Sequence, residues 1–152
     1  MSEFRLHSVW RVRKQREDQA QQHLAQAQRL QQEICSQLET EKDRLASLHT
    51  DMHHLQTKGV DPQTLQLFEH CIQSSRQYCL DLNQDLARAE VVIQERQEHL
   101  SAACREKKVV EKLHERHLER WAAEMRRAEK NLMDEIASGV VARKRVVTGE
   151  QQ

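Results

Sequence analysis

Apolar residues recur at alternating spacings of three and four along most of this chain. A helix that packs one face against another helix shows this pattern, whereas a strand would place apolar residues at every second position. The spacing therefore predicts long coiled-coil helices. In the first part of the chain the apolar positions are Leu6, Trp10, Ala20, Leu24, Ala27, Ile34, Leu38, Leu45, Leu48, Met52 and Leu55.

The same heptad register also places polar side chains in the seam, the row of positions that faces the partner helix. Polar residues in a seam cost stability but favour one pairing register over the alternatives. We therefore expect a coiled coil whose seam is interrupted by polar residues and which has one preferred register. The polar seam residues are Arg13, Glu17, Gln31 and Glu41.

The composition supports long helices and argues against a sheet or a thick globular core. The 152 residues include three glycines and one proline, and aromatic residues make up only 3%. Such a chain lacks both turn-forming residues and the bulky residues that favour strands. Polar, charged chains can also be disordered, but the regular apolar spacing argues against disorder here.

One break divides the sequence, at residues 58–62. Gly59 can adopt the left-handed backbone conformation that ends a helix. Asp61 can cap the next helix, and Pro62 suits its first turn because no N–H bond is required there. After the break the apolar positions resume at Leu65, Phe68, Ile72, Cys79, Leu82, Leu86, Ala89, Ile93, Leu100, Ala103 and Val110.

These features predict an all-α fold, a long antiparallel two-helix coiled-coil hairpin that forms one domain over residues 1–152. The first helix is expected at about 4–57, the turn at 58–62, the second helix at about 62–137 and a frayed tail at 138–152. A short connection makes consecutive helices antiparallel neighbours. The second helix is the longer one, so about 20 residues at its end, on the order of 30 Å, should overhang the first helix.

The overhanging end keeps an apolar face. Beyond Val110 we interpret consecutive four-residue steps at His114 and Leu118 as a stutter in the heptad register. An isolated helix of this length is marginal in water, because most helical stability comes from packing an apolar face. Self-association and fraying of an unimportant end are possible explanations, but we favour docking of another protein. The expected docking surface is formed by Leu118, Trp121, Met125, Leu132 and Ile136.

The charges are unevenly distributed, although 24 basic and 24 acidic side chains give zero net charge. Residues 1–16 carry +4 and residues 105–130 carry +3, whereas residues 17–104 carry −7. A hairpin brings the two basic segments to the same end. Such a field can orient a molecule as it meets a partner and raise the encounter rate.

No sequence feature indicates catalysis, a cofactor or a functional metal site. His49 and His53 share a helix face, as do His114 and His117, but no HExxH motif occurs and a two-helix hairpin rarely supplies four metal ligands. Gly-rich phosphate loops and Ser/His/Asp constellations are also missing from the sequence. We therefore expect a protein that is not an enzyme.

Other classes of partner are disfavoured as well. Aromatic residues hardly interleave with the basic ones, so we do not expect nucleic-acid binding. No window is apolar enough for a membrane span, and residues 1–10 lack the apolar core of a signal peptide. The four cysteines show no CxxC pairing, and free thiols fit a reducing cytoplasm. They are Cys35, Cys71, Cys79 and Cys104.

Short motifs along nearly the whole chain carry a resemblance to a known family. They are Phe4-Arg5-Leu6 and Val9-Trp10-Arg11-Val12-Arg13 followed by Glu17 and Ala20, then Val110-Glu111-Lys112-Leu113 followed by His114-Glu115-Arg116, and finally Leu132-Met133-Asp134-Glu135-Ile136-Ala137 before Arg143-Lys144-Arg145. With these motifs the chain resembles the flagellar export protein FliJ family.

The resemblance implies a cytoplasmic component of the flagellar type III export apparatus, associated peripherally with the inner membrane. Members of that family are antiparallel two-helix coiled coils similar to the γ stalk of rotary ATPases. They sit in the central hole of the export ATPase hexamer, contact the cytoplasmic domain of the export gate membrane protein FlhA, and help to recycle export chaperones. The family's gate-binding surface would include Phe68 and Ile72, whereas Ser75 and Cys79 depart from the usual residues.

Two alternatives share the coiled-coil pattern. One is a structural protein that acts through self-association, for instance as a parallel dimer, which the break at 58–62 disfavours. The other is the equivalent stalk of a virulence type III secretion injectisome, which has the same architecture. For the flagellar interpretation, we expect the 118–136 surface to engage the ATPase ring and the half next to the turn to meet the gate.

Overall fold

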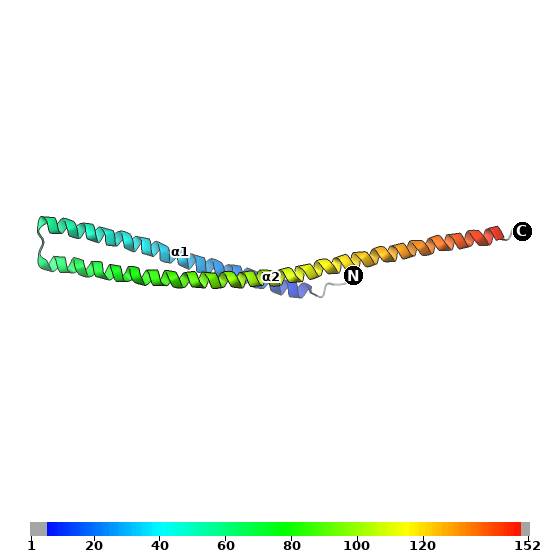
Figure 1. Cartoon of the computed structure of the whole chain (residues 1–152), viewed down its shortest axis with the longest axis horizontal. Helices are drawn as coiled ribbons and strands as arrows, with labels where there is room; N and C mark the ends of the chain where they lie inside the picture. Colours follow the sequence, from blue (N-terminus) through cyan, green and yellow to red (C-terminus); the bar gives the residue numbers. More distant parts are fainter. Residues whose placement is uncertain (1–5, 150–152) are drawn as a thin grey trace. The chain divides into compact units, whose positions relative to one another are not determined.

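The computed structural model describes the backbone of residues 6–149, with side chains up to residue 144. It contains two helices, α1 over His7–Lys58 and α2 over Pro62–Gly149 (Figure 1). The described residues include no strand. The predicted all-α helical hairpin is therefore confirmed.

Three residues, 59–61, connect the helices, within the range 58–62 where the turn was expected. Gly59 has a φ of 83°, in the left-handed region that residues with a β-carbon rarely adopt. Pro62 is the first residue of α2, where its missing N–H and fixed φ do no harm. The N–H of Leu65 donates to the carbonyl oxygen of Asp61 at 3.2 Å, which starts the hydrogen-bond ladder of α2.

The far end of α2 differs from the expectation. We expected the helix to end at about 137 and the tail 138–152 to fray, but α2 continues to Gly149, and residues 150–152 lie outside the described range. Gly139 stays helical, because a single glycine costs only about 1 kcal/mol relative to alanine and no proline follows it. The expected start of the first helix, near residue 4, also lies outside the described residues.

The chain divides into two compact units. The turn unit comprises residues 13–105, and the terminal unit comprises residues 1–12 together with 106–152. Each unit contains a part of α1 and a part of α2, so each has its own helix-to-helix contacts. That both belong to one domain over 1–152 stays a prediction.

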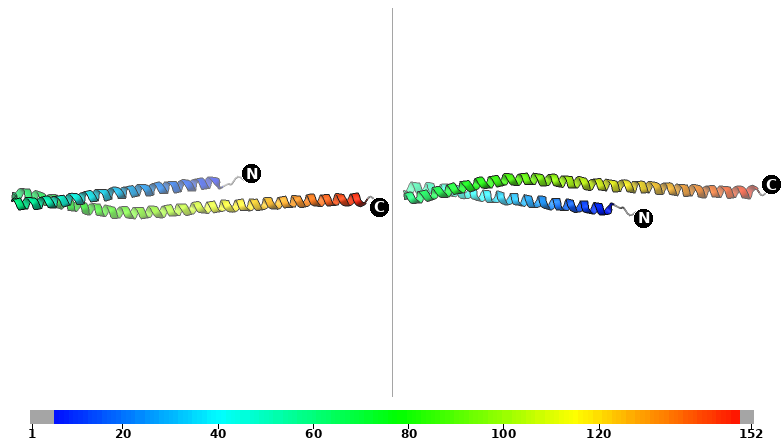
Figure 2. Two further views of the ribbon diagram at one scale, coloured as in Figure 1. Left: turned by 90° about the horizontal axis from the view of Figure 1, so that it is seen from above. Right: turned by 90° about the horizontal axis from the view of Figure 1, so that it is seen from below.

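In the turn unit the two helices pack side by side through the predicted seam (Figure 2). Leu38 of α1 is buried against Cys79 and Leu82 of α2, and Ile34 and Leu86 pack at the edges of this cluster. The direction is antiparallel, since Glu41 contacts Ser75 while Glu17, earlier on α1, contacts Cys104, later on α2. Cysteine acts in this core as a small apolar residue.

The polar seam residues lie where the heptad register placed them. Arg13, Glu17 and Gln31 are half-buried, and Glu41 is buried. The hydroxyl of Ser75 donates to Oε1 of Glu41, so the buried carboxylate has a partner on the opposite helix. This hydrogen bond can form only when Glu41 lies opposite Ser75, so it favours one register of helix pairing.

In the terminal unit the seam of α2 continues through Val110, which is buried, and through half-buried Lys107, His114 and His117. These positions are three, four and three residues apart, so the heptad register runs on to His117. The stutter through Leu118 that we expected is therefore wrong over this stretch. The apolar pattern was misleading because a lysine and two histidines occupy seam positions, where their long or ring-shaped side chains can fill space.

Candidate partner-binding surface

The predicted docking surface on α2 is exposed. Its five members are each between 44% and 57% exposed, and they lie on a helix whose described side chains from Glu124 to Lys144 are all exposed. Spacings of three, four and, between Met125 and Leu132, seven residues place these large apolar side chains on one face of the helix. We call this face the 118–136 surface: Leu118, Trp121, Met125, Leu132 and Ile136.

The apolar face is longer than the sequence predicted. Val140, four residues beyond Ile136, is large, apolar and exposed on this face, and exposed Met133 lies at its edge, whereas exposed Val141 lies on another side of the helix. Residues 140 and 141 were not included in the predicted surface, because the helix was expected to end at about 137. In a frayed tail their side chains would not have been held on a particular helix face. Contiguous exposed apolar faces are typical of surfaces that bind other macromolecules.

Charged residues flank the 118–136 surface. Arg126, Arg127 and Lys130 are exposed on the same stretch of α2, as are Glu124 and Glu129. Their charges give the apolar face a rim of both signs with an excess of basic residues. Rim charges of this kind affect the encounter rate and the choice of partner more than the final affinity.

The two residues of the expected gate surface lie in the turn unit and differ in accessibility. Phe68 is half-buried, whereas Ile72 is only 5% exposed. Ile72 also lines a cavity of about 450 Å³ with His49 and Met52 of α1 and with Glu69, Gln73 and Arg76 of α2. Phe68 therefore presents more surface to a partner than Ile72 does.

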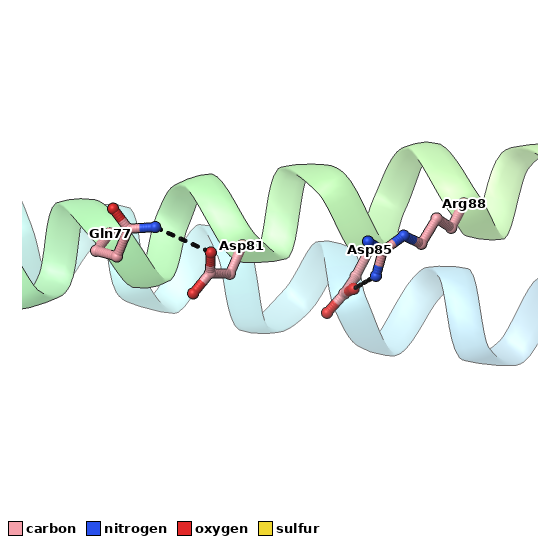
Figure 3. Close-up of polar contacts among 4 residues, drawn as sticks. All are labelled: Gln77, Asp81, Asp85 and Arg88. Carbon is pink, nitrogen blue, oxygen red and sulfur yellow. Dashed lines mark hydrogen bonds and ion pairs between the residues drawn. The ribbon is translucent and has the colours of Figure 1, made fainter.

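The outer face of α2 in the turn unit carries polar contacts within one helix. Nε2 of Gln77 donates to Oδ1 of Asp81 at 3.1 Å, and Nη1 of Arg88 pairs with Oδ1 of Asp85 at 3.3 Å (Figure 3). Exposed pairs of this type contribute only a few tenths of a kcal/mol to helix stability. These contacts join neighbouring turns of α2 and do not form a binding site.

The comparison with family models decides the assignment. The model described as "Flagellar FliJ protein" matches residues 1–146, which is nearly the whole chain. The chain belongs to the FliJ family. No curated protein and no solved structure matches the chain.

FliJ membership makes the chain a component of flagellar type III export and thus of flagellum biogenesis. FliJ proteins are non-catalytic components of this pathway and associate with the export apparatus. The predicted family and the coiled-coil hairpin are therefore confirmed.

Three further observations on this FliJ-family chain concern membrane spans, metal ligands and disulfides. No helix in the described range is long and apolar enough to cross a membrane. Among the same residues there is no group of three or more His, Cys, Asp or Glu side chains that could hold a metal ion. None of the four cysteines, all within residues 6–149, forms a disulfide.

Proposed function

We propose that this protein acts as a stalk of the flagellar export apparatus and uses the 118–136 surface to bind inside the export ATPase hexamer. The exposure of five large apolar side chains on one face of α2 supports this proposal. Trp121 and Met125 belong to the charged stretch 105–130, where basic residues exceed acidic ones. Apolar anchors with a charged rim are typical of binding surfaces between proteins.

The half of the hairpin next to the turn would contact the cytoplasmic domain of the export gate membrane protein. Phe68, which is half-buried, is the better candidate for direct contact, because Ile72 is largely occupied by packing against α1. In this role the protein would work in the cytoplasm, peripherally at the inner membrane, and would also assist the recycling of export chaperones. It would link partners without catalysing a reaction.

Binding to the purified export ATPase hexamer tests the first contact. Trp121→Ala combined with Met125→Ala removes two side chains of the 118–136 surface, and we expect a loss of about 2–4 kcal/mol, or roughly 30- to 1,000-fold in Kd, if both are hot spots. Both residues are exposed, so the hairpin should stay folded. Isothermal titration calorimetry at fixed salt gives the Kd.

The matched control is Val91→Ala combined with Val92→Ala, two exposed apolar residues of α2 in the turn unit. This double substitution should leave the Kd within about two-fold, because exposed side chains away from an interface contribute little. Equal binding by the wild type and the Trp121/Met125 variant would rule out the 118–136 surface as the ATPase contact.

Binding to the cytoplasmic domain of the gate tests the second contact. Phe68→Ala should weaken it by about ten-fold or more, as expected for one aromatic anchor. Leu67→Ala is the control, since Leu67 is the preceding residue on α2 and is more exposed than Phe68. If both variants bind the gate domain as tightly as the wild type, Phe68 does not form this contact.

A further inference from the structure

In the terminal unit the first turns of α1 pair with the middle of α2. The indole Nε1–H of Trp10 donates to Oε1 of Glu111 at 3.2 Å, so these two residues lie opposite each other. Because the helices run in opposite directions, residue 12 lies opposite the turn of α2 that contains residue 109, and residue 9 lies opposite the turn that contains residue 113. The start of α1 is therefore beside residues 109–113.

The pair of helices has two flanks, one on each side of the seam. A two-fold axis perpendicular to the plane of the two helices relates the members of an antiparallel pair, so equivalent positions of both helices lie on the same flank. Residues that directly follow seam positions line the first flank. There a cavity of about 400 Å³ is lined by His7, Glu111 and Glu115, together with the seam residues Trp10 and His114.

The opposite flank carries an apolar patch to which both helices contribute. Each of its four residues directly precedes a seam residue, and each is between 38% and 59% exposed. The spacing of three residues on α1 and of four on α2 keeps each pair on one helix face. We call this surface the flank patch: Val9, Val12, Val109 and Leu113.

The charge around the flank patch is basic. Residues 1–16 carry +4 and residues 105–130 carry +3. Arg116 and Arg120 are both exposed and continue the α2 side of this flank, one and two turns beyond the patch, whereas Glu106 lies before it. Basic surroundings of this kind attract an anionic partner and repel a cationic one.

We propose that the flank patch binds an acidic amphipathic helix of a partner protein. The patch spans two neighbouring helices, so a third helix can pack one apolar stripe against both of them. Aspartate or glutamate side chains beside that stripe would form charge-assisted hydrogen bonds with Arg116 and Arg120.

A partner protein fits this patch better than an anionic membrane surface does. The excess of positive charge is confined to residues 1–16 and 105–130, whereas residues 17–104 carry −7. An extended anionic surface would repel that middle stretch, while a single acidic helix meets only the basic segments. The flank patch also shares no residue with the 118–136 surface, so the proposal does not rest on the ATPase contact.

Fluorescence anisotropy tests the proposal with the full chain and a labelled peptide. The probe is a peptide of about 18 residues, or about 27 Å as a helix, locked by lactam bridges, with leucine at spacings of three and four and glutamate beside the leucines. Two further peptides carry glutamine or lysine in place of those glutamates. We expect a saturable Kd of roughly 0.1 mM for the glutamate peptide at low salt, and binding at least about five-fold weaker for the other two.

Removal of the apolar side chains tests the patch itself. Val9→Ser combined with Leu113→Ser should weaken binding of the glutamate peptide by about ten-fold or more. The matched control is Val91→Ser combined with Val92→Ser, two exposed apolar residues of α2 in the turn unit. The control should bind the peptide within about two-fold of the wild type.

Removal of one basic side chain tests the charge complementarity. Arg116→Gln should weaken binding of the glutamate peptide by about three-fold and should reduce the dependence of the Kd on salt. Arg29→Gln is the control, since Arg29 is an exposed arginine of α1 in the turn unit. It should leave both the Kd and its salt dependence unchanged.

The combined Trp121→Ala and Met125→Ala variant separates this site from the 118–136 surface. It should bind the peptide like the wild type, and a loss of peptide binding in this variant would place the peptide on the 118–136 surface and overturn the proposal. Weakened ATPase binding by the same variant with unchanged peptide binding would support two separate sites.

Four other results would overturn the proposal. They are no saturable binding of the glutamate peptide, equal binding of the three peptides, unchanged binding by the Val9/Leu113 variant, and co-sedimentation with phosphatidylglycerol vesicles that this variant abolishes. The last result would assign the flank patch to a membrane surface. Circular dichroism verifies that the helices of each variant are intact, which is expected because the replaced side chains are exposed.

Discussion

The hydroxyl of Ser75 on α2 donates a hydrogen bond to the carboxylate of Glu41 on α1, and both residues are buried in the seam of the turn unit. Nη1 of Arg44 lies 3.8 Å from the other carboxylate oxygen, one turn along α1. A buried carboxylate without such partners would be costly. This pair is therefore the polar contact that most directly fixes how the two helices are paired.

Removing the Ser75 hydroxyl should destabilise the hairpin. Ser75→Ala leaves a buried carboxylate oxygen without its donor, and we expect the free energy of unfolding to fall by about 1–3 kcal/mol in urea titrations followed by circular dichroism. Ser74→Ala is the control, because Ser74 is exposed and its replacement should change stability by less than about 0.5 kcal/mol.

Replacing both partners should cost less than removing one. Glu41→Leu combined with Ser75→Ala leaves an apolar seam with no unsatisfied polar atom at this pair, so we expect stability equal to or above that of the wild type. The same urea titration measures it. A double variant that is less stable than Ser75→Ala alone would contradict the role we give to this pair.

The core cluster of the turn unit gives a further prediction. Leu82 is only 4% exposed and packs with Leu38 and Cys79, so Leu82→Ala should lower the free energy of unfolding by about 2–4 kcal/mol. Leu80→Ala removes the same atoms from a side chain that is 57% exposed and should cost less than about 1 kcal/mol. Similar losses for the two variants would show that the seam does not run through Leu82.

Replacement of Gly59 and of Gly139 by alanine should change stability in opposite directions. Gly59 has a left-handed φ, and a β-carbon added there would have no atom within 4 Å, so Gly59→Ala should destabilise by about 1 kcal/mol through the backbone alone. Gly139 also has open space around it but is helical, so Gly139→Ala should favour α2 by about 0.5–1 kcal/mol.

Global unfolding measures the effect at Gly59. Hydrogen exchange of the amides around residue 139 measures the effect at Gly139, because that stretch of α2 is exposed and can open locally. A stabilising Gly59→Ala would mean that the turn does not require the left-handed conformation.

The bond between Trp10 and Glu111 should hold the beginning of α1 in place. Trp10→Phe keeps an aromatic ring but removes the Nε1–H donor, which should reduce the local stability of residues 7–12 by about 0.5–1.5 kcal/mol. Hydrogen exchange should show faster exchange there and no change around Leu38. Unaltered exchange at residues 7–12 would show that this hydrogen bond does not stabilise the start of the helix.

Much of the hairpin follows from local sequence rules. The spacing of apolar residues placed Leu38, Ile72 and Leu82 in the seam, and it also placed Glu41 there, although a charged residue alone would not suggest burial. The left-handed Gly59 followed from its position between two helical patterns. Ser75 was not recognised as the partner of Glu41, because pairing across helices depends on register rather than on local sequence.

The part of α2 from Lys107 onward was harder to predict. Apolar residues continue on α2, but the seam itself passes through Lys107, His114 and His117, whose burial depends on what packs against them. The helix end was also missed, since one glycine is a weak signal without a proline after it. The hydrogen bond between Trp10 and Glu111 joins residues that are far apart in the chain, so no local pattern predicts it.

The central claim is that the chain folds back on itself at Gly59 so that α1 and α2 pair within one molecule. Pulsed electron paramagnetic resonance tests it most directly, with spin labels at positions 18 and 105, next to the contacting residues Glu17 and Cys104, in a background whose four native cysteines are replaced by alanine. Asp18 and Arg105 are both exposed, and the labelled chain is diluted with unlabelled protein to suppress signals between molecules. Pairing within the molecule predicts a narrow distance distribution below about 35 Å, whereas a continuous helix would separate the labels by about 130 Å, beyond the reach of the method. A short distance that persists on dilution is the predicted result, and its absence would contradict the hairpin.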